Sequence, residues 1–328
     1  MMFQWHLDLW RTRVKGAELP QSLLLVAARG SGERAFALTL AQALLCRQAD
    51  PQGLPCGQCD DCRWFLANAH PDFLLLDPDK EQDEGGEGAQ PAAADKERRR
   101  RREIDVGQVR TAGAFIRLAP VRQRARVVML HPAESLNAVA ANALLKDLEE
   151  PPSAARFILV SNAPGRLLPT IRSRCVRLVL PRPSTQAAAA WLGSRGQGSP
   201  ALALAQTAGM PEAAAALDAR YWRVRETLLA RLGNPSAGLA GLDVKDTDWL
   251  AVVHVAQTWA WDVMAARFRL ELRYHPDHGD AIRGVAKRAN PVFVARFEQR
   301  LAQARRLVEH PLNVRLQTEQ ILVESQSL

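Results

Sequence analysis

Four of the five cysteines lie close together, at Cys46, Cys56, Cys59 and Cys62. Two residues separate each of the last three, a spacing typical of structural zinc sites, where thiolates surround a tetrahedral ion. Four thiolates fill the coordination sphere and leave no open position for a hydrolytic water. The spacing predicts a structural Zn²⁺ module at residues 46–62. An iron–sulfur cluster or four reduced thiols are the alternatives.

The fifth cysteine, Cys175, precedes an apolar run, and we expect it to be a small buried side chain. An odd cysteine count with a metal-type cluster fits a reducing compartment better than a disulfide framework. The seven histidines show no ligand spacing that matches the cysteines. His275 and His278, which flank a Pro-Asp pair, are expected to lie in a surface loop.

A glycine-rich segment follows the apolar run at residues 22–28, in the place where a phosphate-binding loop would lie. An active loop reads G-x-x-x-x-G-K-[ST]: its backbone N–H groups hold phosphates, its Lys neutralises them and its hydroxyl binds Mg²⁺. Gly30 and Gly32 are present here, but Glu33 and Arg34 occupy the Lys and Ser/Thr positions. A carboxylate repels a triphosphate and a guanidinium does not bind Mg²⁺. The loop is therefore predicted to be degenerate, with no ATP bound by this chain.

The acidic partner of an active phosphate loop is also missing from its expected place. Such an ATPase carries an acidic residue after an apolar strand, where it holds Mg²⁺. After the apolar run at residues 126–130, this sequence has His131 and Pro132. Glu134 lies further along, and we interpret it as the start of a helix. Two separate losses predict no intrinsic ATPase activity; an active ATPase with an atypical loop is the alternative.

Alternating strand-like and helical runs must position these residues. The expected strands are residues 22–28, 73–76, 125–130, 157–160 and 176–180, and the helical runs between or beside them are residues 36–45, 106–118, 138–150 and 167–171. This order predicts an α/β domain with a parallel sheet covered by helices on both faces. Only helical patterns follow, at residues 184–192, 200–208, 212–232, 246–268, 290–309 and 311–328. The second part of the chain is therefore predicted to be all-α.

Length and composition limit the possible classes of protein. A chain of 328 residues with 47% apolar and 24% charged residues is long for one core and too apolar for wholesale disorder. No apolar stretch approaches the about 20 residues of a membrane span. The first ten residues lack the apolar centre of a signal peptide. We expect a cytoplasmic protein that does not associate with membranes.

The formal net charge of +8 is unevenly distributed. Residues 104–181 carry 11 basic and 5 acidic residues, so most of the excess lies there. Residues 77–103 combine an acidic stretch with Arg98–Arg102 and contain almost no apolar side chains, which predicts a disordered insertion. The arginine run leaves a zinc-containing nucleic-acid-binding regulator as an alternative function.

Three stretches together resemble the clamp-loader branch of the AAA+ family. They are the cysteine cluster, Ala141–Pro152 (ANALLKDLEEPP) and Leu168–Cys175 (LPTIRSRC). The resemblance covers nearly the whole chain in order, and it implies an AAA+ P-loop-type core at residues 1–181. A small helical lid at residues 182–213 and a helical collar at residues 214–328, through which subunits assemble, are implied to follow.

The resemblance also implies roles for single residues. In this family the arginine of a Ser-Arg-Cys motif projects from one subunit towards ATP held by its neighbour. Arg174, between Ser173 and Cys175, is thus implied to be an arginine finger that acts in trans. On residue type alone, a surface ion pair is the alternative for Arg174. Asn162 occupies the family's phosphate-sensing position and is expected to be structural here.

The partners are implied by the same resemblance. They are the delta and gamma/tau subunits of the bacterial DNA polymerase III clamp loader, in a hetero-pentameric ring, with the sliding clamp contacted indirectly. The chain would then be a non-catalytic component of the polymerase holoenzyme. With 8 Trp, 2 Tyr and 9 Phe and no aromatic stacking series, contact with primed DNA is expected to be weak and directed to the phosphate backbone.

Overall fold

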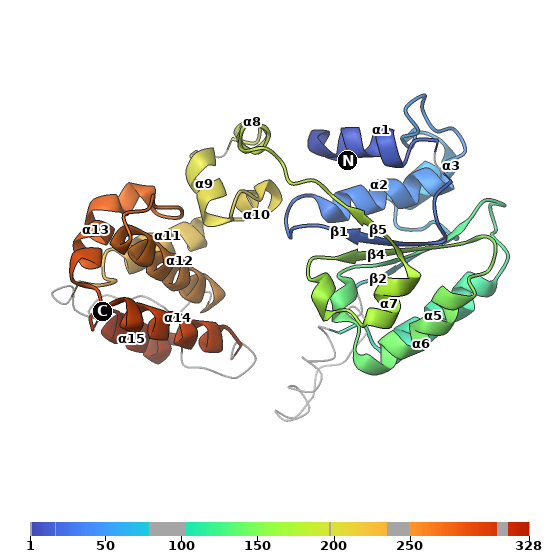
Figure 1. Cartoon of the computed structure of the whole chain (residues 1–328). Coiled ribbons are helices and arrows are strands. Elements are labelled where there is room, and N and C mark those ends of the chain that lie inside the picture. Colours follow the sequence, from blue (N-terminus) through green and yellow to red (C-terminus); the bar gives the residue numbers. More distant parts are fainter. Residues whose placement is uncertain are drawn as a thin grey trace. The chain divides into compact units, whose positions relative to one another are not determined.

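The computed structural model describes residues 2–16, 18–78, 103–196, 198–234, 249–306 and 314–327. The chain forms two compact units that divide between Ser184 and Thr185 (Figure 1). Most of the predicted insertion, residues 79–102, lies outside the described residues. Within the described residues, no helix has the length and apolar character needed to cross a bilayer.

The first unit is built on a sheet of five parallel strands, as predicted. In chain order they are β1 (Ser22–Val26), β2 (Phe73–Leu76), β3 (Arg126–Leu130), β4 (Ala155–Ser161) and β5 (Val176–Val179). Their spatial order is β2-β3-β4-β1-β5. In this register Leu24 of β1 lies between Leu159 of β4 and Arg177 of β5. The carboxyl ends of β1, β3 and β4 therefore meet at one edge, where α/β folds bind ligands.

Helices cover both faces of this sheet (Figure 1). On one face lie α1 (Leu7–Arg13), α2 (Glu33–Leu45) and α3 (Asp60–Leu66); on the other lie α5 (Val106–Arg117), α6 (Ala138–Glu149) and α7 (Pro169–Arg174). Successive strand residues point to opposite faces. Accordingly Leu25 packs in one core with Phe36 of α2, whereas Leu24 packs in the other core with Leu144 of α6. The predicted α/β architecture is confirmed.

Helix α6 carries most of the ANALLKDLEEPP motif, and local sequence signals set both of its ends. The side chain of Asn137 accepts a hydrogen bond from the backbone N–H of Ala140 at 2.9 Å, a typical N-cap. Pro151 and Pro152 follow Glu150 and prevent the helix from continuing. The motif therefore ends at a defined position beside the sheet.

The described residues of the second unit form helices and the loops between them, with no strand among them. Its helices are α8 (Thr185–Gly193), α9 (Pro200–Gln206), α10 (Pro211–Ala215), α11 (Ala219–Leu229), α12 (Trp249–Arg267), α13 (Gly279–Arg288), α14 (Pro291–Arg306) and α15 (Val314–Ser325). The prediction of one helix over residues 212–232 is wrong. The Asp218 carboxylate caps the backbone N–H of Tyr221 at 2.9 Å, so α11 starts anew there. The boundary between lid and collar at residue 213 stays a prediction.

The expectation that His275 lies in a surface loop is also wrong. His275 is fully buried, and its Nε2 lies 3.0 Å from the hydroxyl of Thr258 on α12. The buried carboxylate of Asp262, also on α12, accepts the backbone N–H groups of His275 at 2.7 Å and of Arg273 at 2.8 Å. A loop-like composition therefore hides a segment that α12 holds in the core through backbone hydrogen bonds.

Acid is expected to destabilise the second unit through His275. Burial, followed by the nearby Arg225 charge, lowers the pKa of His275 to about 3. Below the ordinary histidine pKa of about 6.5, the unfolded chain binds a proton that folded His275 does not, so stability falls by about 1.4 kcal/mol per pH unit. The free energy of unfolding, measured in urea between pH 6.5 and pH 4, should fall less steeply with decreasing pH in the His275→Gln variant. The difference in slope should correspond to one bound proton, about 1.4 kcal/mol per pH unit. An equal slope in both proteins would contradict this assignment.

Candidate functional site

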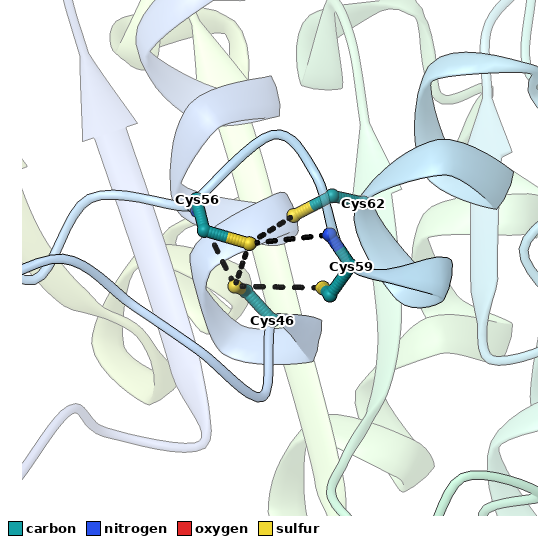
Figure 2. A group of neighbouring side chains, drawn as sticks. All are labelled: Cys46, Cys56, Cys59 and Cys62. Atoms are coloured by element: carbon teal, nitrogen blue, oxygen red, sulfur yellow. Dashed lines mark hydrogen bonds between the residues drawn. The ribbon is translucent and has the colours of Figure 1, made fainter.

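The four clustered cysteines converge on one point (Figure 2). Their Sγ atoms all lie within 4.8 Å of one another. The Sγ atom of Cys46 lies 3.6 Å from that of Cys56 and 3.9 Å from that of Cys59. A tetrahedral ion with metal–sulfur bonds of about 2.3 Å has sulfur–sulfur edges of about 3.8 Å. The arrangement therefore fits a single four-coordinate metal ion.

Helix ends and a tight turn bring these thiols together. Cys46 caps the C-terminus of α2, Cys59 caps the N-terminus of α3, and Cys62 lies in the first turn of α3. Cys56 comes from the loop between these helices, where Gly57 adopts a left-handed φ of 72°. The backbone N–H of Cys59 donates to Cys56 Sγ at 3.4 Å. The turn thus aims a backbone donor at a ligand sulfur.

The protein environment acts differently on the individual thiols. Hydrogen bonds from the backbone N–H groups of Gln58 and Cys59 lower the pKa of Cys56 to about 6. Burial raises the pKa of Cys62 to about 12 and also raises that of Cys46. A cation favours the thiolate form of a ligand. The donor set therefore suits a metal ion whose charge offsets the burial of these two thiols.

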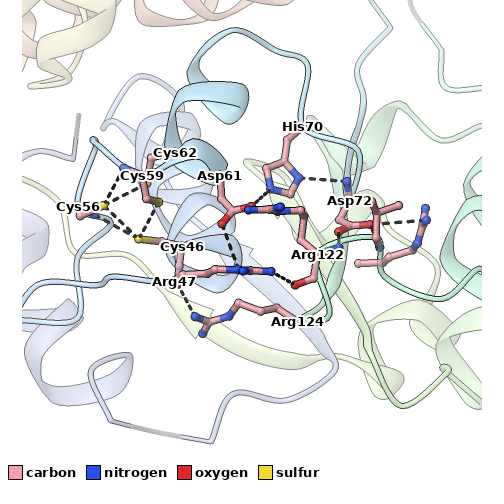
Figure 3. Close-up of polar contacts among 12 residues, drawn as sticks. Cys46, Arg47, Cys56, Cys59, Asp61, Cys62, His70, Asp72, Arg122 and Arg124 are labelled. Atoms are coloured by element: carbon pink, nitrogen blue, oxygen red, sulfur yellow. Dashed lines mark hydrogen bonds and ion pairs between the residues drawn. The ribbon is translucent and has the colours of Figure 1, made fainter.

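Asp61, between the last two cysteines, anchors the cysteine module to the sheet (Figure 3). Its buried carboxylate accepts a hydrogen bond from Arg122 Nε at 2.6 Å, and Arg47 Nε and His70 Nε2 each lie 3.5 Å away. Burial alone would raise the pKa of Asp61, but the Arg122 hydrogen bond and the Arg122 and Arg47 charges outweigh it and lower the pKa. Arg122 precedes β3, so an ion pair between buried Asp61 and partly exposed Arg122 joins the module to the sheet.

A second buried acid holds the same loop. The Asp72 carboxylate accepts the backbone N–H groups of Val121 and Arg122, each at 2.8 Å. Arg124 in turn donates to the carbonyl of Cys46. This network was not predicted, because it joins acids and arginines that lie about 50 to 60 positions apart in the sequence.

The glycine-rich loop after β1 is filled by its own Glu33. The Glu33 side chain is buried, and its oxygens accept the backbone N–H groups of Gly30 at 3.2 and 3.1 Å and of Ser31 at 3.1 Å. Asn162, just after β4, donates Nδ2–H to Glu33 Oε1 at 3.1 Å and to the carbonyl of Ala27 at 3.2 Å. In an active loop the backbone N–H groups hold phosphate. Here the carboxylate accepts the hydrogen bonds that a phosphate would accept.

The N-terminal segment covers the same loop. Gly32 has a φ of 95°, and a Cβ at this position would lie 2.1 Å from Phe3 Cδ2, so the ring rests directly on the glycine. Phe3 stacks on Trp5 with a centroid distance of 4.6 Å, and Trp5 Nε1 donates to the carbonyl of Ser31 at 2.9 Å. This cover was not expected; the aromatic residues near the N-terminus were the available signal.

The other residues that were compared with a nucleotide site lie at the same sheet edge. Arg34 pairs with Asp77 at 3.3 Å, and Asp77, which the prediction placed in the insertion, is buried instead. His131 follows β3, where burial, followed by the Arg34 charge, lowers its pKa. Glu134 lies in a 3₁₀ turn (Ala133–Ser135) that ends before α6 begins at Ala138, so it does not start that helix. Its Oε1 also accepts the backbone N–H of Asn162 at 3.1 Å.

Arg174 lies apart from these groups, at the C-terminal end of α7. Its side chain is 32% exposed; Nη1 donates to the carbonyl of Thr170 at 3.0 Å, and Nη2 pairs with the carboxylate of Glu149. Ser173 Oγ also donates to Thr170, at 3.0 Å. Cys175 is buried as expected, and burial raises its pKa to about 11. Within this chain, Arg174 therefore forms the surface ion pair that the sequence left as the alternative.

The chain is similar to known subunits of DNA polymerase III. The family model described as "DNA polymerase III, delta subunit" matches residues 4–184, which is more than half of the chain. The DNA polymerase III subunit delta' of Pseudomonas aeruginosa is 36% identical over 203 residues, which cover 62% of this chain and 56% of that protein. The Escherichia coli subunit delta' is 37% identical over 216 residues, covering 64% and 58%. The chain thus spans little more than half the length of these two relatives.

A similarity to another subunit type is weaker. The DNA polymerase III subunit gamma/tau of Mycobacterium bovis is 32% identical over 163 residues, which cover 48% of this chain and 25% of that protein.

Proposed function

The chain belongs to the family of DNA polymerase III delta-prime clamp-loader subunits, and we propose that it completes an ATP-hydrolysing site in a neighbouring subunit. In this proposal the chain binds no ATP itself and supplies Arg174 in trans. One contrast supports the proposal: Glu33 occupies the phosphate cradle of this chain, whereas the guanidinium of Arg174 remains partly exposed.

The proposed role follows from the chemistry of phosphoryl transfer. Negative charge spreads over the oxygens of the transferred phosphoryl group, and an arginine supplied by a neighbouring protein stabilises it. Arg174 presents a planar group with several N–H donors, which suits bidentate contact with phosphate oxygens. ATP hydrolysis then belongs to the neighbouring subunit, and this chain has no activity alone.

The isolated chain is expected not to bind Mg²⁺-ATP at micromolar concentrations. Glu33 already accepts the N–H groups of Gly30 and Ser31, and Phe3 covers Gly32. Equilibrium titration with fluorescent ATP checks this expectation. The Glu33→Lys variant should also fail to bind, because the Phe3 cover remains and Arg34 does not ligate Mg²⁺. Micromolar, Mg²⁺-dependent binding by the unaltered chain would favour the alternative, an active ATPase.

For the cysteine module we propose a structural Zn²⁺ ion. Thiolates are preferred zinc ligands, and four of them leave no position for a substrate. Sulfur–sulfur distances of 3.6 and 3.9 Å suit one ion, whereas a cluster of several iron atoms would have to separate the thiolates further. When bound, the ion would cross-link α2, the following loop and α3. The ion pair between Asp61 and Arg122 would then fix this cross-linked module against the sheet.

The proposed assembly contains the delta and gamma/tau clamp-loader subunits and loads the sliding clamp on primed DNA in the cytoplasm. Family membership and the similarity to a gamma/tau subunit support these partners. Apolar side chains for subunit contact are exposed on and beside the helices of the second unit, among them Trp261, Phe268 and Phe293. We assign DNA contact a minor, backbone-directed part. The arginine run that would serve the regulator alternative lies outside the described residues.

A further inference from the structure

We propose that Glu149 is a positioning residue for Arg174. Its carboxylate orients the Arg174 guanidinium until a phosphate of the ATP bound by the neighbouring subunit replaces the carboxylate. The inference deepens the proposed function and rests on it. Glu149 belongs to the ANALLKDLEEPP motif, and the sequence alone assigned no role to this residue beyond its place near the end of a helix.

The two side chains project from helix ends that the core holds in place. Glu149 is the last residue of α6, and Arg174 is the last residue of α7. Leu144 of α6 and Ile171 of α7 belong to the same buried cluster, each no more than 1% exposed. Because packed helices do not slide freely, the carboxylate stays within reach of the guanidinium.

Charge at the helix ends favours this pairing. The carbonyl groups at a helix C-terminus attract cations and repel anions. Arg174 therefore sits at a favourable position, and its Nη1 bonds to the carbonyl of Thr170 at 3.0 Å. Glu149 sits at an unfavourable position, which the Arg174 cation offsets. The pair thus compensates for a placement of Glu149 that would otherwise be destabilising.

The pairing orders Arg174 without occupying all of its donors. Among the described residues, Nη1 and Nη2 each have one acceptor, whereas buried Nε has none. The guanidinium has five N–H donors. Some N–H donors of Arg174 therefore remain available for phosphate oxygens. The two hydrogen bonds that it does form select one orientation of its side chain.

The ion pair between Arg174 and Glu149 is weak enough for a phosphate to replace the carboxylate. The two side chains are 32% and 49% exposed, and pairs at such exposure shift an equilibrium by about fivefold or less. A triphosphate with several negative charges competes easily with a single carboxylate of this strength. A long arginine loses rotamer freedom when it is fixed, so ordering it beforehand reduces that cost in the transition state.

The test uses the clamp loader reconstituted with gamma/tau and delta, with the clamp and primed DNA present. Removing the charge with Glu149→Gln is expected to lower the single-turnover rate of ATP hydrolysis about two- to fivefold, with the apparent KM for ATP unchanged. Glu149→Asp, which keeps the charge, should recover part of the loss. Glu150→Gln is the matched control, since Glu150 is the exposed neighbour and has no ion pair among the described residues.

A double variant separates positioning from a general structural effect. If Glu149 acts through Arg174, Glu149→Gln has no further effect in the Arg174→Ala background. An equal loss in both backgrounds, or a rate for Glu149→Gln equal to that of the unaltered protein, would overturn the positioning role. In the latter case a large effect of Arg174→Ala would leave the proposed function standing. A rate unchanged by Arg174→Ala would instead remove the proposed function itself.

Discussion

Replacing Arg174 with Ala is expected to lower ATP hydrolysis at the neighbouring site by about 10³-fold or more, the effect that arginine fingers have in GTPases. The substitution removes the cation that offsets charge on the transferred phosphoryl group, while α7 keeps its buried contact through Ile171. Single-turnover hydrolysis by the reconstituted loader measures this site before other steps limit the rate.

Two further variants define the role of the guanidinium. Arg172→Ala is the matched control, because Arg172 is exposed on the same helix and outside the Ser-Arg-Cys motif. Arg174→Lys keeps the positive charge but loses the planar donor arrangement, and we expect most of the loss to remain. Equal losses for Arg172→Ala and Arg174→Ala would indicate a general effect of surface charge rather than a specific finger.

Removing one cysteine ligand is expected to have the largest effect on stability. Cys56→Ser should cost the chain its metal ion, because serine is a poor ligand for a site built of thiolates. Zinc contributes about 10 to 16 kcal/mol in zinc-finger peptides, as much as the about 5 to 15 kcal/mol that stabilises a whole domain. If a third of that contribution acts here, the unfolding temperature falls by roughly 10 °C or more.

Metal analysis combined with calorimetry checks this prediction. The unaltered protein should contain one zinc ion per chain and Cys56→Ser none, and a strong chelator should reproduce the lower unfolding temperature. Cys175→Ala is the control, since Cys175 is buried outside the cluster and should not change the metal content. A full zinc complement in Cys56→Ser, or an unchanged unfolding temperature, would show that the four thiols are not a structural metal site.

The sheet and its order along the chain could be predicted because strand and helix patterns are local. Runs of apolar residues of strand length, separated by helical runs, required no knowledge of distant contacts. The cysteine spacing was equally local. Parallel strands place the residues after β1, β3 and β4 at one edge of the sheet, and Glu33, His131 and Asn162 follow these strands.

The contacts of these residues could not be predicted, because they join positions far apart in the sequence. Asp61 meets Arg122 across 61 positions, and Asn162 meets Glu33 across 129. The sequence indicated that Glu33 would repel a triphosphate, but not that its buried carboxylate would accept the backbone N–H groups of Gly30 and Ser31. His275 was misjudged for a similar reason: its neighbours suggested a loop, whereas Asp262 holds its backbone in the core.

The central claim is that this chain completes a neighbour's ATP site through Arg174. A finger that acts in the transition state should strengthen the binding of a transition-state analogue far more than the binding of ADP. The decisive measurement is the affinity of the reconstituted loader for Mg²⁺-ADP with aluminium fluoride, compared with Mg²⁺-ADP alone. We predict that Arg174→Ala weakens analogue binding at the adjoining site at least about 100-fold, the lower end for transition-state analogues, and leaves ADP binding nearly unchanged. Equal analogue affinity in the two loaders would contradict the account.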